Sequence, residues 1–331
     1  MSFMQNCLGS VAAMAVLAGA AVAEPALMYD LGGKFDKSFN EAAYNGAKRW
    51  AEETGESYRE IEVTAEAQRV QFATRLAEGG FNPIVVLGFA NASTLEEVAP
   101  KYPDTTFVLV DMVVDLPNVR SVVFEEHQGS FLVGMMAAMA SETGTVGFIG
   151  GMDVPLIRHF ACGYAQGAKA VNPDITVIAN MTGTTPTAWN DPVKGGELTK
   201  AQISQGADVV YSAAGGTGVG VLQAAADADI LSIGVDSNQN HLHPGKVLTS
   251  MLKRVDNAVY NAFSDGAEME TGMVVMGLAD DGVGYALDEN NAPLVTDEMK
   301  AAVDAAREKI IAGELNVVSY YENDSCPALD F

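Results

Sequence analysis

Short runs of apolar residues alternate along this chain with longer segments in which apolar residues recur every three or four positions. Because the short runs are continuous, they are typical of parallel strands that are buried on both faces. We expect strands at 26–29, 84–87, 107–110, 146–149, 209–211 and 230–235. We expect helices at 41–53, 67–78, 129–140, 157–170, 197–205, 219–226, 256–269 and 297–312. This alternation predicts an α/β fold with doubly wound parallel sheets.

The order of elements runs twice, over residues 24–124 and again over 145–250. Each half opens with a strand, a loop and a helix, and each later holds a strand that an aspartate closes. The sequence contains no low-complexity linker between the halves. We therefore expect two lobes that share crossovers of the chain.

The first 23 residues carry no charged side chain and end in Ala21-Val22-Ala23, just before Glu24. A short apolar segment with this ending is typical of a cleaved secretory signal, and it is too short to span a bilayer. The lack of Lys and Arg in the segment argues against a signal, and a buried helix is the alternative. Cys7 lacks the small residues that a lipoprotein cleavage site needs before it, so we expect an exported, soluble product without a lipid anchor.

Cleavage there leaves about 300 residues, enough for two domains of about 100–200 residues each. The 43 acidic and 19 basic residues give a net charge of −24, which excludes nucleic acid or an anionic membrane as the main partner. A hydrophobic content of 48% excludes a disordered chain. Only Cys162 and Cys326 follow the expected signal. One disulfide bond and two free thiols are both consistent with them.

Candidate ligand contacts lie where the predicted strands end, because open parallel sheets bind ligands beyond the carboxyl ends of their strands. Asp30, Asp111 and Asp236 each follow a predicted strand, and Gly215 and Lys253 follow the runs 209–214 and 247–252. A single aspartate in this place is more often a helix or turn cap. Three of them, with a glycine-rich loop in each half and a lysine, indicate a site for a small polar ligand. A carboxylate can accept hydrogen bonds from two adjacent hydroxyl groups.

Two aromatic residues and an amide extend this set. Asn40 offers both a donor and an acceptor. Phe39 and Trp189 could hold a planar ring between them by offset stacking. Packing under the first helix explains Phe39 equally well. Trp189 lies in the polar turn segment 184–192, where a large apolar side chain needs a reason.

A series of motifs gives the chain a family resemblance. Its strongest parts are Asp36-Lys37-Ser38-Phe39-Asn40, Gly129-Ser130-Phe131-Leu132-Val133-Gly134, Gly150-Gly151-Met152-Asp153-Val154-Pro155, Ala214-Gly215-Gly216-Thr217-Gly218, Gly234-Val235-Asp236-Ser237-Asn238-Gln239 and Leu248-Thr249-Ser250-Met251-Leu252-Lys253. In this order and spacing, they resemble the basic membrane protein family of periplasmic receptors for ATP-binding-cassette (ABC) importers, which includes purine nucleoside receptors. The resemblance covers nearly the whole chain after residue 23.

The resemblance implies roles for individual residues. In nucleoside-binding members, the phenylalanine and asparagine that match Phe39 and Asn40 stack on the base and bind the ligand. The residues that match the contacts to the ribose and part of the base are Asp30, Asp111, Asp236 and Lys253. The second stacking aromatic of the family is usually a phenylalanine, but here a divergent stretch after Gly183 reaches Trp189. A nucleoside, a free base and a related heterocycle therefore all fit.

Two enzyme classes are the alternatives. An NAD-dependent oxidoreductase is suggested by the glycine-rich segment 216–220, with Asp236 lying 20 positions after Gly216, but the third glycine comes one residue early. A nucleoside hydrolase would use clustered aspartates to hold calcium and activate water. Asp30 and Asp36 are too far apart in sequence for that pattern, and lysines lie beside them.

A metal site is not expected from the sequence. His241 and His243 form a His-x-His pair, but Pro244-Gly245 follows and indicates a surface turn, and other cysteines and histidines are distant in sequence. The segment Glu125-Glu126-His127 has the composition of an acid–base group. We expect it instead to cap the helix at 129–140 and to form one crossing between the lobes.

These observations predict a type I periplasmic binding protein of an ABC importer that binds a purine nucleoside or base between two closing lobes. The expected partner is an ABC permease in the inner membrane, and the expected state is a monomer without cofactor or catalytic residue. The expected N-terminal lobe is 24–124 plus about 253–280, and the expected C-terminal lobe is 125–252 plus about 281–331. Hinge crossings are expected near 124–128, 250–254 and 275–287.

Overall fold

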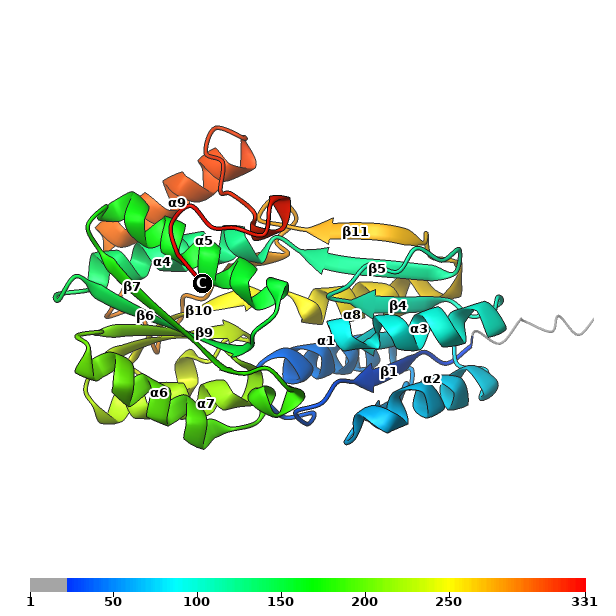
Figure 1. The fold of residues 1–331 in the computed structure, drawn as a ribbon. Helices are drawn as coiled ribbons and strands as arrows, with labels where there is room; N and C mark the ends of the chain where they lie inside the picture. Colours follow the sequence, from blue (N-terminus) through cyan, green and yellow to red (C-terminus); the bar gives the residue numbers. More distant parts are fainter. Residues whose placement is uncertain (1–22) are drawn as a thin grey trace, which may run out of the picture.

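The computed structural model describes residues 23–331, which form two lobes, each built on a six-stranded sheet (Figure 1). The expected signal peptide lies outside the described residues, apart from Ala23. Within the described part of the chain, no helix is both long and apolar enough to cross a membrane. Both sheets are dominated by parallel strands, so the predicted doubly wound α/β class is confirmed.

The first lobe holds a sheet in which every pair of neighbours is parallel. Its strand order is β11 (Gly272–Met276), β5 (Val119–Phe124), β4 (Phe107–Val110), β3 (Ile84–Leu87), β1 (Ala26–Tyr29) and β2 (Arg59–Glu62). The helices of this lobe are α1 (Phe39–Thr54), α2 (Arg69–Glu78), α3 (Ala92–Val98) and α8 (Val255–Asp265). The core divides by sheet face: α1 and α8 share one cluster with the sheet, and α2 and α3 share the other.

The second lobe repeats this plan with one antiparallel strand. Its order is β12 (Val283–Tyr285), β10 (Val247–Lys253), β9 (Leu231–Asp236), β8 (Val209–Ala213), β6 (Thr145–Met152) and β7 (Thr176–Gly183). Only β12 runs antiparallel to its neighbour, β10. The helices are α4 (Glu126–Ala140), α5 (Pro155–Val171), α6 (Pro192–Ser204), α7 (Gly218–Asp227) and α9 (Asp297–Ile311). Helices α4 and α5 pack on each other, as do α6 and α7.

Several segments of the chain join the two lobes. The chain passes from the first sheet to the second between β5 and α4, returns between β10 and α8, and crosses again between β11 and β12 (Figure 1). The C-terminal segment after α9 runs back across the molecule, and the disulfide bond between Cys162 and Cys326 fastens it to α5. The sequence left this pairing open, and the structure forms it.

Candidate functional site

One cavity lies between the two lobes, where the carboxyl ends of strands from both sheets meet. It contains about 580 Å³ of empty space, including the part that opens to solvent, a size typical of small-molecule sites. The structure brings all eight predicted site residues to its walls. These are Asp30, Phe39, Asn40, Asp111, Trp189, Gly215, Asp236 and Lys253. Strand ends far apart in the sequence therefore converge on one site.

The loop before α1 is organised around Asp36, which the sequence analysis did not select as a site residue. Its buried carboxylate accepts hydrogen bonds from the backbone N–H groups of Ser38, Asn40 and Glu41, at 2.8, 3.0 and 3.1 Å. Asp36 thereby satisfies N–H groups that a helix start leaves without partners. Burial raises the pKa of Asp36 to about 7, although these N–H groups lower it in part.

Asn40 borders the cavity, but most of its side-chain hydrogen bonds are made to the protein itself. Its Oδ1 accepts from the backbone N–H of Asp30 at 3.1 Å. Its Nδ2 donates to the carbonyls of Asp30 and Gly33, each at 3.2 Å. Both amide protons are therefore used, and one lone pair of Oδ1 is left for a ligand. In this geometry, Asn40 chiefly holds the loop in place.

Asp30 is paired with a residue that no sequence motif pointed to. Nη2 of Arg69, on α2, lies 2.9 Å from Oδ1 of Asp30, and both side chains are largely buried. Burial still raises the pKa of Asp30, against the lowering effect of Arg69. Gly88 lies against the same carboxylate with φ at 90°, and a Cβ at Gly88 would come within 2.1 Å of Oδ2 of Asp30. Only glycine fits this place.

Lys253 is a buried cation between two carboxylates. Its Nζ lies 2.7 Å from Oδ1 of Asp111 and 2.9 Å from Oε1 of Glu126. Burial by itself lowers the pKa of Lys253, but the surrounding carboxylates overcome this and raise it. Burial also raises the pKa values of Asp111 and Glu126, although Lys253 opposes the rise. The lysine is thus held charged, and the ring of Phe39 lies with its centroid 5.4 Å from Nζ.

The role of Glu126 differs from the expectation. We expected the segment 125–127 to cap the following helix, but Glu125 at the N-cap makes no side-chain capping bond. Glu126 instead begins α4, is buried, and points at Lys253. The local sequence resembles a helix start. The partner of Glu126 is a lysine that is distant in sequence and comes close only in the folded protein.

Asp236 connects the lobes. Its Oδ2 accepts a hydrogen bond from the Ser38 hydroxyl at 2.5 Å. Burial raises the pKa of Asp236 to about 6, while Lys253 and the Ser38 bond lower it in part. Asp236 and Asp111 both have left-handed backbones, with φ at 62° and 78°. Positive φ at a residue other than glycine is strained, and such strain is typical of functional sites.

Trp189 reaches the cavity from the short 3-10 helix Pro186–Trp189. A Cβ at Gly151 would lie 2.1 Å from the indole ring, so the ring rests directly on the backbone of β6. Phe89 meets the indole edge-on, with centroids 6.5 Å apart. Gly215, with φ at 55°, lies beside Trp189. Phe89 and Phe160 also line the cavity and were not selected from the sequence; the stacking of a ligand ring between Phe39 and Trp189 stays a prediction.

Comparison with known proteins decides the family. The model of the Bmp family, described as ABC transporter substrate-binding protein PnrA-like, matches residues 24–319. The chain belongs to the Bmp family of ABC transporter substrate-binding proteins. The resemblance inferred from its motifs is thereby confirmed.

Relatives of this Bmp-family protein support the assignment. The chain is 32% identical over 319 residues to the ABC transporter nucleoside-binding protein BmpA of Lactococcus lactis subsp. cremoris, covering 89% of this chain and 88% of BmpA. It is 34% identical over 279 residues to an uncharacterized lipoprotein of Pyrococcus horikoshii, covering 78% of this chain and 68% of that protein. The crystal structure of an ABC transporter solute-binding protein from Aeropyrum pernix K1 superposes with a TM-score of 0.81 at 28% identity, covering 91% of this chain and 95% of that one.

The family model, BmpA and the Aeropyrum pernix protein are all described as substrate- or solute-binding proteins, which confirms the expectation that this Bmp-family protein is not an enzyme. The glycine-rich segment that suggested a dinucleotide site has a packing explanation. A Cβ at Gly220 would lie 1.8 Å from the carbonyl oxygen of Pro192, so glycine allows α7 to approach the start of α6. The main motif that suggested an oxidoreductase, the glycine-rich segment, is therefore explained by helix packing.

Proposed function

We propose that this protein binds a purine nucleoside or purine base between its two lobes and delivers it to the permease of an ABC importer. The observation that carries the proposal is the cavity, whose walls combine the aromatic side chains of Phe39 and Trp189 with the carboxylates of Asp30, Asp111 and Asp236. Aromatic faces suit a planar base, and carboxylates suit hydroxyl and N–H donors. The nucleoside-binding name of the relative from Lactococcus lactis supports the same ligand class.

The charge of the site also favours this ligand class over an anionic one. Among the described residues, four aspartates line the cavity, namely Asp30, Asp36, Asp111 and Asp236, and Lys253 is the one basic residue at its walls. Asp111 already neutralises Lys253 together with Glu126. A phosphate or carboxylate ligand would therefore meet uncompensated negative charge, whereas a neutral nucleoside brings hydrogen-bond donors.

We propose that the ligand acts by stabilising lobe closure. In this structure, the lobes already touch through polar contacts: besides the Ser38–Asp236 bond, Ser237 Oγ donates to the carbonyl of Ser38 at 2.8 Å, and Gln239 Nε2 donates to that of Lys37 at 2.9 Å. A ligand that contacts both lobes only when they are closed shifts the open–closed equilibrium, and the permease can read the closed shape. The proposed hinge is made of the crossings near 124–128, 250–254 and 275–287, with the lobe boundaries given above.

We also propose that the protein works outside the cytoplasm, in the periplasm, after cleavage of the signal at residues 1–23. A pool of ligand reaches an importer from that side, and the disulfide between Cys162 and Cys326 suits an oxidising compartment. N-terminal sequencing of the exported protein tests this: a mature chain that begins at Glu24 supports it, and a chain that keeps residues 1–23 or carries a lipid at Cys7 contradicts it.

Isothermal titration calorimetry tests the ligand class. The mature protein, unfolded to remove bound ligand and then refolded, is titrated with adenosine, guanosine, inosine, adenine, hypoxanthine and ribose. Saturable binding of nucleosides without turnover supports the proposal and shows that the aspartates read the sugar. Binding of the free bases alone would indicate that the pocket recognises only the purine ring. If none of these compounds binds to protein that has a native circular dichroism spectrum, the proposed purine ligand is wrong.

A further inference from the structure

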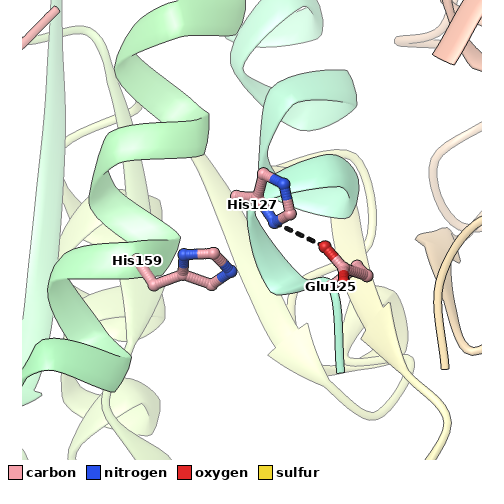
Figure 2. Close-up of side chains that lie close together, drawn as sticks. All are labelled: Glu125, His127 and His159. Carbon is pink, nitrogen blue, oxygen red and sulfur yellow. Dashed lines mark ion pairs between the residues drawn. The ribbon is translucent and has the colours of Figure 1, made fainter. Parts of the chain in front are cut away.

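Beside the ligand cavity, two buried histidines and a glutamate converge (Figure 2). His127 lies in the first turn of α4, Glu125 immediately precedes this helix, and His159 comes from α5. Nδ1 of His127 lies 3.3 Å from Oε2 of Glu125, and the two imidazole rings have their centroids 4.3 Å apart. One donor atom from each residue falls within 4.8 Å of the others.

Close packing of α4 against α5 creates this arrangement. A Cβ at Gly163 would lie 2.2 Å from the carbonyl oxygen of His127, so glycine lets α5 touch the backbone of α4 at the level of the histidine. His159, one turn before Gly163, then faces His127. The convergence is invisible in the sequence because 31 residues separate the two histidines, and the pair that the sequence presents is His241 with His243.

Nδ1 of His127 is a buried nitrogen that points at the cluster. The imidazole ring bonds to the backbone of Val317, and its Nδ1 is buried without a hydrogen-bond partner among the described residues. This Nδ1 faces the carboxylate of Glu125. A cation between this nitrogen and Oε2 of Glu125, which lie 3.3 Å apart, would satisfy both.

His159 completes the set of donors. Its Nε2 lies 3.8 Å from Oε2 of Glu126, an oxygen that is also buried and has no hydrogen-bond partner in the described chain. Its Nδ1 accepts a hydrogen bond from the backbone N–H of Tyr320 at 3.3 Å and lies 3.4 Å from Oγ of Ser319, so Nε2 is the ring nitrogen available to an ion.

We propose that Glu125, His127 and His159 form a binding site for a divalent transition-metal ion, with Zn²⁺ as the best-suited ion. Imidazole nitrogens suit zinc and its neighbours, whereas calcium and magnesium prefer oxygen ligands. Two tetrahedral ligands at about 2.0–2.1 Å from zinc lie about 3.3–3.4 Å apart, which matches the separation of His127 and Glu125. Two histidines and one carboxylate leave a fourth position for water.

An ion can reach this site from solvent. A second cavity, with about 850 Å³ of empty space, is lined by both Glu125 and His159. The site also lies at a crossing between the lobes, because the backbone N–H of Glu125 donates to the carbonyl of Met276 on β11. A bound ion therefore ties this crossing to α5. Because an ion that binds only the folded chain stabilises it, zinc raises the melting temperature.

The histidine content of the chain allows a clean test. The sequence contains four histidines, which are the buried pair and a second pair, the exposed His241 and the half-buried His243. Untagged protein, treated with a chelator, is titrated with Zn²⁺ by calorimetry and with Co²⁺ by visible absorption. We expect one ion per chain, d–d bands of a four-coordinate Co²⁺ site, and a raised melting temperature. The control variant H241A/H243A keeps all three results.

Variants of the buried donors provide the decisive comparison. His159→Gln is expected to weaken Zn²⁺ binding at least tenfold. Because this residue is buried and the variant can fail to fold, Glu125→Gln serves beside it: Glu125 is one-third exposed, and glutamine keeps its shape. Circular dichroism confirms that each variant is folded. Three outcomes would overturn the proposal. The wild type shows no saturable zinc binding, H241A/H243A abolishes the binding, or Glu125→Gln and His159→Gln leave it unchanged.

Discussion

The hydroxyl of Ser38 donates to Oδ2 of Asp236 across the two lobes, at 2.5 Å. Ser38 stands immediately before α1, where a serine usually caps the helix. Here, its side chain makes no capping bond, because Asp36 takes over that task and frees the hydroxyl. Asp236 is also a predicted ligand contact. The bond therefore links the ligand site directly to lobe closure.

Ser38→Ala is expected to weaken both closure and ligand binding. The variant removes a hydrogen bond to a buried carboxyl group, which costs about 1–3 kcal/mol, or roughly 5- to 150-fold in affinity. Calorimetry with the nucleoside that the panel identifies measures the loss, and small-angle X-ray scattering of the unliganded variant shows the lobes further apart. Ser237→Ala is the matched control, since its hydroxyl bonds only to a neutral carbonyl. Equal losses in both variants would mean that the charge of Asp236 does not govern closure.

Gly151→Ala is expected to reduce ligand affinity without touching the ligand. The new methyl group meets the indole of Trp189, which must leave its place at the cavity wall. Trp189→Ala removes the same ring and defines the full loss. Trp50 and Trp189 are the two tryptophans of the chain, so fluorescence in a Trp50→Phe background reports Trp189 alone.

The control for the indole is Phe35→Ala, because Phe35 is exposed and does not line the cavity. Its affinity should match that of the wild type. If Trp189→Ala also binds ligand with wild-type affinity, the indole belongs to the scaffold, and the predicted stacking role is wrong.

Lys253→Met is expected to destabilise the protein by about 3–5 kcal/mol at neutral pH. Asp111 and Glu126 would remain buried without their cation. Because burial raises the pKa of both carboxyl groups, protonation relieves the repulsion, and the loss should shrink as the pH falls towards about 5. Urea denaturation measures it. Lys300→Met removes an exposed ion pair with Asp304 and should cost less than about 1 kcal/mol. Equal costs for the two lysines would contradict the buried triad.

The predicted fold and the observed one differ mainly at the edges of the sheets. The continuous apolar runs of β1, β3 and β4 are found correctly because both faces of these strands are buried. The four edge strands were missed. These are β2, β7, β11 and β12. Edge strands face solvent and need no continuous apolar run, as in β2, which reads Arg-Glu-Ile-Glu; β11 reads Gly-Met-Val-Val-Met and was missed although it has such a run. Strand β5 was missed in the interior, since Arg120 and Ser121 interrupt its pattern.

The sequence predicts those site residues whose position follows from the course of the backbone. Asp30, Asp111 and Asp236 follow strands, and the topology alone brings strand ends together. Arg69 and Glu126 were missed because each stands in an ordinary helical pattern, and only a distant partner gives it a role. Charge pairing across the fold leaves no local signal in the sequence.

The pH dependence of stability offers a test of Asp36. Its pKa is raised to about 7 by burial, so the folded state holds a proton that the unfolded chain has released. The resulting stability is complete below the ordinary carboxyl pKa of about 4 and is lost as the pH rises through about 7. Asp36→Asn cannot titrate. Between about pH 5 and pH 8, the wild type should therefore lose about 2–3 kcal/mol more unfolding free energy than the variant.

Urea denaturation at the two pH values measures this difference, and the variant serves as its own reference. The introduced amide accepts hydrogen bonds through one oxygen only, so Asp36→Asn is less stable at every pH, and the slope rather than the absolute value carries the result. His127 and His159 act in the opposite direction, because burial lowers their pKa values to about 3 and stability is lost as the pH falls below 6.5. Both histidines are present in wild type and variant, so their effect cancels. Parallel slopes would show that Asp36 stays ionised in the folded protein, held by its three N–H donors against the cost of burial.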